Sequence, residues 1–495
     1  MQNIIIIGAG IAGLSAGVYA LQSGFNVTIL EQHTIPGGFC TSWKRGGYLF
    51  EGGLHWLMGS SDKHPMHDIW RNLGAINDST KVYTGDPTMT YDHEGQRINF
   101  YRDVEKLRAH LIDIAPEDKK EINNFCDTIR ACSKIAMPIT DIKGVKVREK
   151  SKMKPGMLLS MLPALLKMVK YGKISTSDYA RRYKNPLLHN FFNSMTDEDY
   201  SIQMLFFPLG FYASGDAGYL EGGSLKMALN MAQRVKSLGG KIQYSAKVEQ
   251  VLIENGKAVG VIVNGERLTA DSVIVTVDTL AAIDNLFPVT HVEPWADTMR
   301  SMKDRLAANT FISLGVEADL SDLPGNITFT LDAPFEYAGK KHHEISIGNY
   351  AAYKDYAPTG CTAVTVIING DTYDFWKGHR DNGTYEDEKN KIADMIVRVL
   401  SEKIPQIQDK IAVIDVATPL TYERYCGSYR GSWMTMMVKG KRDKEFPLKS
   451  EVAQGLYYAG QRMQPPGGMP PAADTGRKAV QYLCKDKKVV FQGAV

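Results

Sequence analysis

The first thirty residues place the tightest constraint on the fold of this 495-residue chain. Ile4–Ile7 is a short β-branched run, which is typical of a buried parallel strand. The residues GAGIAG follow, and the apolar stretch after them predicts a helix. Val27–Leu30 predicts the next strand, which ends at the acidic residue Glu31. Residues 1–30 carry no charge, as expected for elements that are buried on both faces of a doubly wound sheet.

This order of strand, glycine turn, helix, strand and acid is typical of a dinucleotide-binding site. We expect Gly8 to make the turn, Gly10 to let the backbone approach a pyrophosphate, and Gly13 to let the helix pack closely on the strand. The N–H groups at the start of the helix would hold the phosphates. Glu31 lies 18 residues after Gly13 and can accept hydrogen bonds from ribose hydroxyls.

Three further glycine-rich segments indicate FAD rather than NAD. PGGFCTSW and GGYLFEGG, within residues 36–53, resemble the second glycine motif of the amine oxidase and phytoene desaturase superfamily of flavoproteins. In that family the loop passes under the pyrophosphate toward the flavin ring. Residues 218–278 resemble the family's helix, strand and β-meander, whose main chain near Val248 would hold the adenine. Residues 455–484 resemble its last strand and final helix, expected from about Ala472, with the helix N-terminus at the flavin.

Together, the glycine pattern and the resemblance imply FAD as the cofactor and one set of cofactor-binding residues. This set comprises Gly8, Gly10, Ile11, Ala12, Gly13, Glu31, Gly37, Gly38, Thr41, Ser42, Gly53, Val248, Gly460, Gly468, Met469 and Ala472. Gly52-Gly53 is expected to leave room for the flavin, whereas Gly46-Gly47 predicts a hairpin turn.

The same blocks predict an α/β fold with two domains. Residues 1–75, 215–285 and 445–490 would form a discontinuous, Rossmann-like FAD-binding domain. Residues 76–214 and 286–444 would form a mixed α+β substrate domain, mostly helical in the first part and with four strand-like runs in the second. Residues 491–495 are expected to be a disordered tail.

The residues after the first glycine pair narrow the resemblance. Typical phytoene desaturases and amine oxidases have an arginine at the position of Phe39, which is followed here by Cys40. The run from this pair to HWLMG, and TPLTYERYCGSYRGS at 418–432, look more like the retinol saturase and carotenoid isomerase branch. This resemblance implies flavin redox chemistry on C=C or C–C bonds of a hydrophobic polyene or isoprenoid, of the saturase or desaturase type. Such chemistry also needs an external electron donor or acceptor.

A saturase needs a proton donor at the second carbon. The candidates by position are His55, beside Gly53, and Tyr422, Glu423 and Tyr425 in the 418–432 segment. Other roles remain open: His55 could hydrogen-bond a loop carbonyl, and the two tyrosines could line an aromatic pocket.

Three other functions remain as alternatives. A carotenoid cis–trans isomerase would use reduced FAD without net redox change. An amine oxidase is disfavoured because the arginine and an evident aromatic cage are missing. A non-enzymatic prenyl- or lipid-binding escort protein of the same fold is disfavoured by the complete glycine pattern and Glu31.

The segment 143–173 indicates a possible contact with a membrane. It holds six basic residues between Lys143 and Lys154, followed by the apolar run Met157–Val169. Thirteen residues are too few to cross a bilayer, and Pro163 is expected to interrupt any continuous helix. The segment could lie at the interface of an anionic membrane, or it could be a buried helix with solvated lysines on its outer side.

Composition excludes several other classes. The net charge of +3 argues against a dedicated nucleic-acid binder. The six cysteines form no CxxC pair, and no basic region precedes the apolar start, so a cytoplasmic protein is expected, with the option of peripheral contact on the membrane's cytoplasmic face. No histidine pair has partners at metal-ligand spacing, so no metal site is expected.

Overall fold

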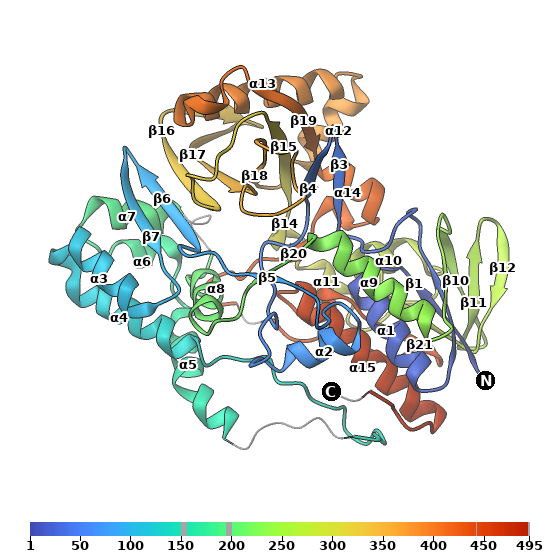
Figure 1. Cartoon of the computed structure of the whole chain (residues 1–495). Helices are drawn as coiled ribbons and strands as arrows, with labels where there is room; N and C mark the ends of the chain where they lie inside the picture. Colours follow the sequence, from blue (N-terminus) through green and yellow to red (C-terminus); the bar gives the residue numbers. More distant parts are fainter. Residues whose placement is uncertain (150–155, 195–199, 442, 494–495) are drawn as a thin grey trace.

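The computed structural model describes residues 1–149, 156–194, 200–441 and 443–493. Strands from three distant parts of the chain form one parallel sheet in the order β21-β13-β1-β2-β9 (Figure 1). The bounds of these strands are β1 Asn3–Ile7, β2 Asn26–Leu30, β9 Lys241–Gln243, β13 Ser272–Val275 and β21 Leu456–Tyr458.

Both faces of this sheet are covered, which explains the uncharged start of the chain. Ile4 and Ile6 pack with the helices α1 (Ile11–Gln22), α9 (Gly223–Ser237) and α15 (Met469–Lys487). Ile5 and Ile7 point to the other face. There they pack with the antiparallel meander of β10 (Val248–Glu254), β11 (Lys257–Val263) and β12 (Glu266–Thr269). The doubly covered parallel sheet predicted from the sequence is confirmed.

A second sheet of seven strands stands above the first in Figure 1, in the order β19-β15-β18-β17-β16-β6-β7. Helices α12 (Tyr373–Asp381) and α13 (Tyr385–Lys403) pack against it around Trp376. Its four central strands coincide with the four strand-like runs expected between 286 and 444. The bounds are β6 Met89–His93, β7 Gln96–Phe100, β15 Asn309–Val316, β16 Asn326–Tyr337, β17 Lys340–Asn349, β18 Thr362–Asn369 and β19 Ile411–Ala417.

A helical lobe adjoins this sheet and has its own apolar core, with Phe125, Tyr179 and Phe206 among the buried rings. Its helices are α3 Val104–Ile114, α4 Lys119–Cys132, α5 Met157–Tyr171, α6 Thr176–Ala180, α7 Pro186–Ser194 and α8 Gln203–Ala213. The division into FAD-binding and substrate domains at the expected residues remains our proposal.

Shorter helices and strands connect the two sheets and the helical lobe. The hairpin of β3 (Ser42–Arg45) and β4 (Tyr48–Glu51) turns at Gly46-Gly47, as predicted. The others are α2 Met66–Asn72, β5 Val82–Tyr83, β8 Tyr219–Leu220, α10 Thr279–Asn285, α11 Ala296–Arg300, β14 Leu306–Ala307, α14 Pro419–Cys426 and β20 Met434–Thr435.

Three sequence-based expectations were wrong. The final helix begins at Met469, three residues before Ala472, because Pro470 and Pro471 fit the first turn of a helix. Helix α5 continues through Pro163, whose exposed ring removes only the hydrogen bond to the carbonyl of Leu159. After α15 the chain stays packed, since Phe491 is 1% exposed and stacks on Tyr19. Residues 494–495 lie outside the described residues.

The described residues contain neither a membrane-spanning helix nor a cluster of metal-binding side chains. No helix there combines the length and apolar character needed to cross a bilayer. In the same part of the chain, no group of three or more His, Cys, Asp or Glu side chains is placed to hold a metal ion.

Candidate active site

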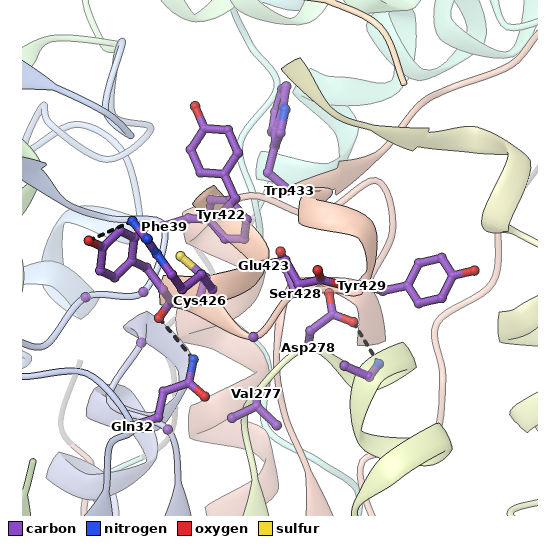
Figure 2. Close-up of a pocket in the computed structure, with 18 of the residues that line it drawn as sticks. Gln32, Phe39, Val277, Asp278, Tyr422, Glu423, Cys426, Ser428, Tyr429 and Trp433 are labelled. Atoms are coloured by element: carbon purple, nitrogen blue, oxygen red, sulfur yellow. Dashed lines mark hydrogen bonds between the residues drawn. The ribbon is translucent and has the colours of Figure 1, made fainter. Parts of the chain in front are cut away.

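A cavity of about 1620 Å³ runs from the carboxyl ends of β1 and β2 to the underside of the second sheet. This volume exceeds the range of about 300–1,000 Å³ that is usual for one small-molecule ligand, so it has room for a dinucleotide and a further ligand. Figure 2 shows Gln32 and Phe39 on one side of the pocket and Asp278 and Tyr429 on the other.

Most residues of the sequence-based set line this cavity. They are Gly8, Gly10, Ile11, Ala12, Glu31, Gly37, Gly38, Gly53, His55, Val248, Tyr422, Glu423, Tyr425, Gly460, Gly468, Met469 and Ala472. Gly13, Thr41 and Ser42 are not in the lining. Thr41 and Ser42 instead lie at the base of the β3–β4 hairpin, where Gly52 N–H donates to the Thr41 carbonyl.

The glycine turn leaves the start of α1 open to the cavity. Gly8 has a left-handed φ of +101°, which favours glycine. A Cβ on Gly10 would meet only the Gly37 carbonyl, at 3.9 Å, so a ligand can approach this backbone. By contrast, a Cβ on Gly13 would lie 1.9 Å from the Gly8 carbonyl oxygen, so Gly13 serves helix packing rather than ligand contact.

No side chain caps the N-terminus of α1, and its first turn carries no acidic residue. The first N–H groups of a helix have no acceptor within the helix. At Ile11 and Ala12 these groups lie in the cavity lining, where they and the helix dipole suit an anionic pyrophosphate.

Glu31 lies next to the glycine turn and is the residue expected to bind the ribose. Its carboxylate accepts hydrogen bonds from Ala9 N–H at 2.7 Å and from His33 N–H at 2.8 Å. Burial raises the pKa of Glu31, and these backbone hydrogen bonds oppose the shift. A carboxylate has about four lone-pair sites, so ribose hydroxyls could still donate to it.

The second glycine pair packs directly on the first motif. Gly37 N–H donates to the Ala9 carbonyl at 2.9 Å, and Gly37 and Gly38 both have positive φ angles. Gly52 and Gly53 both line the cavity, so room for the flavin stays a prediction, and the protein's own packing gives a second reason for these glycines. A Cβ on Gly52 would lie 2.4 Å from the Trp43 ring, and one on Gly53 would lie 2.3 Å from the Phe39 carbonyl oxygen. The chain's own close packing therefore requires these glycines.

The final helix presents fewer donors to the cavity than an ordinary N-terminus. Pro470 and Pro471 have no N–H, and Gly468 N–H donates to Gln461 Oε1 at 3.0 Å. The N–H of Met469 and the helix dipole therefore remain to stabilise negative charge at this end.

His55 is exposed to the cavity, while the protein around it desolvates its ring. Desolvation lowers its pKa, and the nearby Glu51 carboxylate opposes the shift. The imidazole is therefore neutral near pH 7, able to donate a proton from one ring nitrogen and to accept one at the other.

A buried network that the sequence reasoning missed lies beneath His55. The fully buried Glu51 carboxylate accepts from the N–H groups of Gly53 and Leu54, both at 2.9 Å. It also accepts from Ser224 N–H at 2.9 Å and from Tyr219 Oη at 2.7 Å, and Tyr219 contacts the hydroxyl of Tyr356. An acid next to a glycine pair, as in FEGG, was the signal that could have found it.

Phe39 and Tyr422 form an aromatic contact at the cavity, with ring centroids 5.7 Å apart and planes tilted by 37°. Burial is the main cause of a raised pKa at Tyr422, so its phenol stays protonated near neutral pH. This geometry agrees with the aromatic-lining role.

The other two candidates have partners of their own. The Glu423 carboxylate accepts from Tyr373 Oη at 2.9 and 3.0 Å. Tyr425 is 43% exposed, and its ring packs edge-on against His33, 5.0 Å away, while its carbonyl accepts from Gln32 Nε2. Both residues line the cavity, with Tyr425 on the Glu31–His33 side.

Arg462 is a second feature that the sequence reasoning missed. It is 4% exposed, donates from Nε to Asp278 at 2.6 Å and from Nη2 to Ser432 Oγ at 2.7 Å, and lines the cavity. Its Nη1 has no hydrogen-bond partner among the described residues. Asp278 and Arg462 each follow a buried strand by a few residues, a position that often carries binding groups.

Comparison with known proteins assigns the family. The model of flavin-containing amine oxidoreductases matches residues 11–484. The chain belongs to this family.

The chain is similar over most of its length to carotenoid and retinoid enzymes. It is 26% identical to the chloroplastic prolycopene isomerase of Daucus carota, over 98% of this chain and 80% of that protein. It is 23% identical to a 4,4'-diapophytoene desaturase of Methylomonas sp, over 99% and 97% of the two chains. Identity to the all-trans-retinol 13,14-reductase of Danio rerio is 23%, over 87% and 76%.

Among solved structures, a putrescine oxidase mutant matches with a TM-score of 0.63 at 15% identity, over 98% of this chain and 99% of that one. This likeness supports the predicted α/β FAD-binding fold. The uncapped α1 N-terminus, Glu31 and the open face of Gly10 fit FAD, which is the cofactor of this oxidoreductase.

Proposed function

We propose that this FAD-dependent oxidoreductase acts on a C=C or C–C bond of a hydrophobic polyene or isoprenoid, as a saturase or a desaturase. The observation that carries this proposal is the Phe39–Tyr422 ring contact in the lining of the cavity. The two rings form an uncharged aromatic wall, which suits a hydrocarbon chain.

The lining beyond the dinucleotide region supports the same class of substrate. It includes the apolar or aromatic side chains of Phe311, Ile367, Leu420 and Trp433. FAD, when bound, supplies hydride transfer at its ring. The protein's part is to hold the polyene against that ring and to exclude water.

His55 is the residue to which we assign proton transfer. Its neutral imidazole opens into the cavity and is backed by the Glu51 carboxylate, which would stabilise an imidazolium if the ring gained a proton. Tyr422, by this proposal, lines the site, and Glu423 and Tyr425 help to close it.

A carotenoid cis–trans isomerase is the second candidate, favoured by the similarity to prolycopene isomerases. One experiment separates the two. Protein with reduced FAD and, in a parallel sample, protein with oxidised FAD are each mixed with a poly-cis carotene or with retinol under anaerobic conditions, and products are analysed by mass spectrometry. A gained or lost hydrogen pair, matched by flavin reoxidation or reduction, supports the redox proposal. Isomerised product of unchanged mass contradicts it.

A net oxidation or reduction of the substrate also requires an external electron donor or acceptor, which we include in the proposal. We propose a cytoplasmic location with contact on the cytoplasmic face of a membrane, because the proposed substrate is soluble in lipid.

A further inference from the structure

Helix α5 exposes an unusual apolar surface. Six of its side chains stand out among the large apolar residues that are exposed in the described part of the chain. They are Leu158 (52% exposed), Leu159 (76%), Leu162 (49%), Leu165 (42%), Leu166 (65%) and Val169 (68%). At 100° per residue, the six fall within an arc of about 120° on one side of the helix. We call this arc the α5 leucine face.

The other side of the helix already has a partner within the molecule. Met161, Ala164, Met168 and Tyr171 are buried, and Met168 and Tyr171 belong to the core of the helical lobe. The α5 leucine face therefore does not contribute to the core of the helical lobe. The sequence left open a buried helix with solvated lysines on its outer side; one side of α5 is buried, and its outer side carries exposed leucines beside the lysines.

Positive charge borders the leucine face. Lys170 follows Val169 on one edge, Lys173 lies just after the helix, and both are exposed. Helix α5 itself carries no acidic residue. A second copy of the chain is a poor occupant, because antiparallel pairing would place these lysines at the positive N-terminus of the partner helix, and parallel pairing would place lysines together.

The segment 143–149 runs near the end of α15, along the lower edge of the view in Figure 1, and it carries three basic residues and one acid, Glu149. Lys143, Lys146 and Arg148 are exposed, and this stretch is fixed by Lys485 Nζ, which donates to the Lys143 carbonyl at 3.0 Å. The nearby Asp486 is paired with Lys449. Lys150, Lys152 and Lys154, also expected to contribute, lie outside the described residues.

We propose that the α5 leucine face docks on an anionic lipid bilayer. The helix lies parallel to the surface with its leucines among the acyl chains, and Lys170 and Lys173 reach the lipid phosphates. Fifteen residues span about 22 Å, which suits an interfacial helix and is too short to cross the bilayer. The proposal does not depend on the reaction assigned above.

Vesicle flotation of the FAD-loaded protein tests the proposal without any turnover assay. Wild type is expected to float at low salt with vesicles of phosphatidylcholine and phosphatidylglycerol, and far less with phosphatidylcholine alone. Leu162→Glu/Leu166→Glu should weaken binding at least about tenfold, because each removes a leucine from the acyl region and adds a charge. Lys170→Glu/Lys173→Glu should weaken binding to the anionic vesicles about tenfold or more.

The matched control is Leu229→Glu, which changes an exposed leucine (47%) on α9. It should float as wild type does. FAD absorbance and melting temperature check that each variant is folded. The proposal is overturned if wild type fails to float, if both vesicle types bind equally, or if Leu229→Glu loses as much binding. It is also overturned if sedimentation velocity reveals a dimer that Leu162→Glu/Leu166→Glu dissociates while vesicles do not bind.

Discussion

The ring of Phe39 lies 5.7 Å from the ring of Tyr422, which links the second glycine loop to helix α14 at the wall of the cavity. Phe39→Arg would break this ring contact and place a charge in the wall. We expect kcat/KM for a polyene substrate to fall at least about tenfold, because a charge held against a hydrocarbon loses its hydration. Phe39→Leu keeps an apolar side chain and should lose much less. Equal losses in the two variants, at equal FAD content, would contradict the apolar-wall role.

Replacement of Glu31 should weaken FAD binding. Glu31→Ala removes the acceptor for Ala9 N–H and His33 N–H as well as the expected ribose contact. We expect the FAD dissociation constant to rise about tenfold or more. Glu31→Gln keeps one acceptor oxygen and should fall between wild type and Glu31→Ala. Titration of apoprotein with FAD, followed by flavin fluorescence, measures the effect, and an unchanged dissociation constant would show that Glu31 only shapes the turn.

His55→Ala should keep the yellow colour of bound FAD and lose turnover. The physical reason is that His55 lines the cavity while the expected cofactor contacts come from other residues. We expect at least about a hundredfold loss in single-turnover rate, the usual contribution of general acid–base catalysis. His67→Ala is the matched control, since His67 lies in the same segment but outside the cavity lining, with its ring on the Gly59 carbonyl. Loss of FAD in His55→Ala would assign His55 to structure instead.

Stability should fall as the pH drops below the ordinary histidine pKa near 6.5. Desolvation lowers the pKa of both His55 and His64 in the folded state. Below about pH 6.5 the unfolded chain therefore binds more protons than the folded chain, so acid favours unfolding. Urea denaturation at several pH values in this range measures how the free energy of unfolding changes with pH. This dependence on pH should be weaker in His55→Gln/His64→Gln than in wild type. If the double replacement leaves the dependence unchanged, other groups cause the effect.

Gly13→Ala should abolish folding of the FAD-binding sheet. Its Cβ would lie 1.9 Å from the Gly8 carbonyl oxygen, which is backbone and cannot swing away. We expect a destabilisation of about 3 kcal/mol or more, seen as insoluble or colourless protein. Gly378→Ala in α12 is the control, because a Cβ there meets nothing within 4 Å. A soluble, fully yellow Gly13→Ala protein would be the contrary outcome.

Local patterns in the sequence predicted most of the FAD-binding fold. The run Ile4–Ile7, the glycines and Glu31 each act on neighbouring residues, so their spacing indicates the turn and the helix directly. The packing reason for Gly52 and Gly53 was not predicted, because it depends on Trp43 and the Phe39 carbonyl, whose positions follow from tertiary packing.

The surroundings of the candidate catalytic residues depend still more on contacts between residues that are distant in the sequence. Glu51 receives the hydroxyl of Tyr219, 168 residues away, and Arg462 reaches Asp278 across 184 residues. No short motif encodes such pairs. Likewise, the sequence of α5 is mostly apolar and did not reveal that the leucines, rather than the lysines, dominate its outer side.

The sheet that carries the glycine turn takes one of its edge strands from residues 456–458, and α15 then packs along α1. During synthesis the N-terminal motif leaves the ribosome early, yet it must wait for more than four hundred further residues before β21 and α15 arrive. Throughout that interval Ile4–Ile7 and the buried face of α1 lack part of their cover, a state that is prone to aggregation. FAD is therefore expected to bind late in the synthesis of this protein. A ribosome-stalled chain that ends before residue 456 should remain colourless.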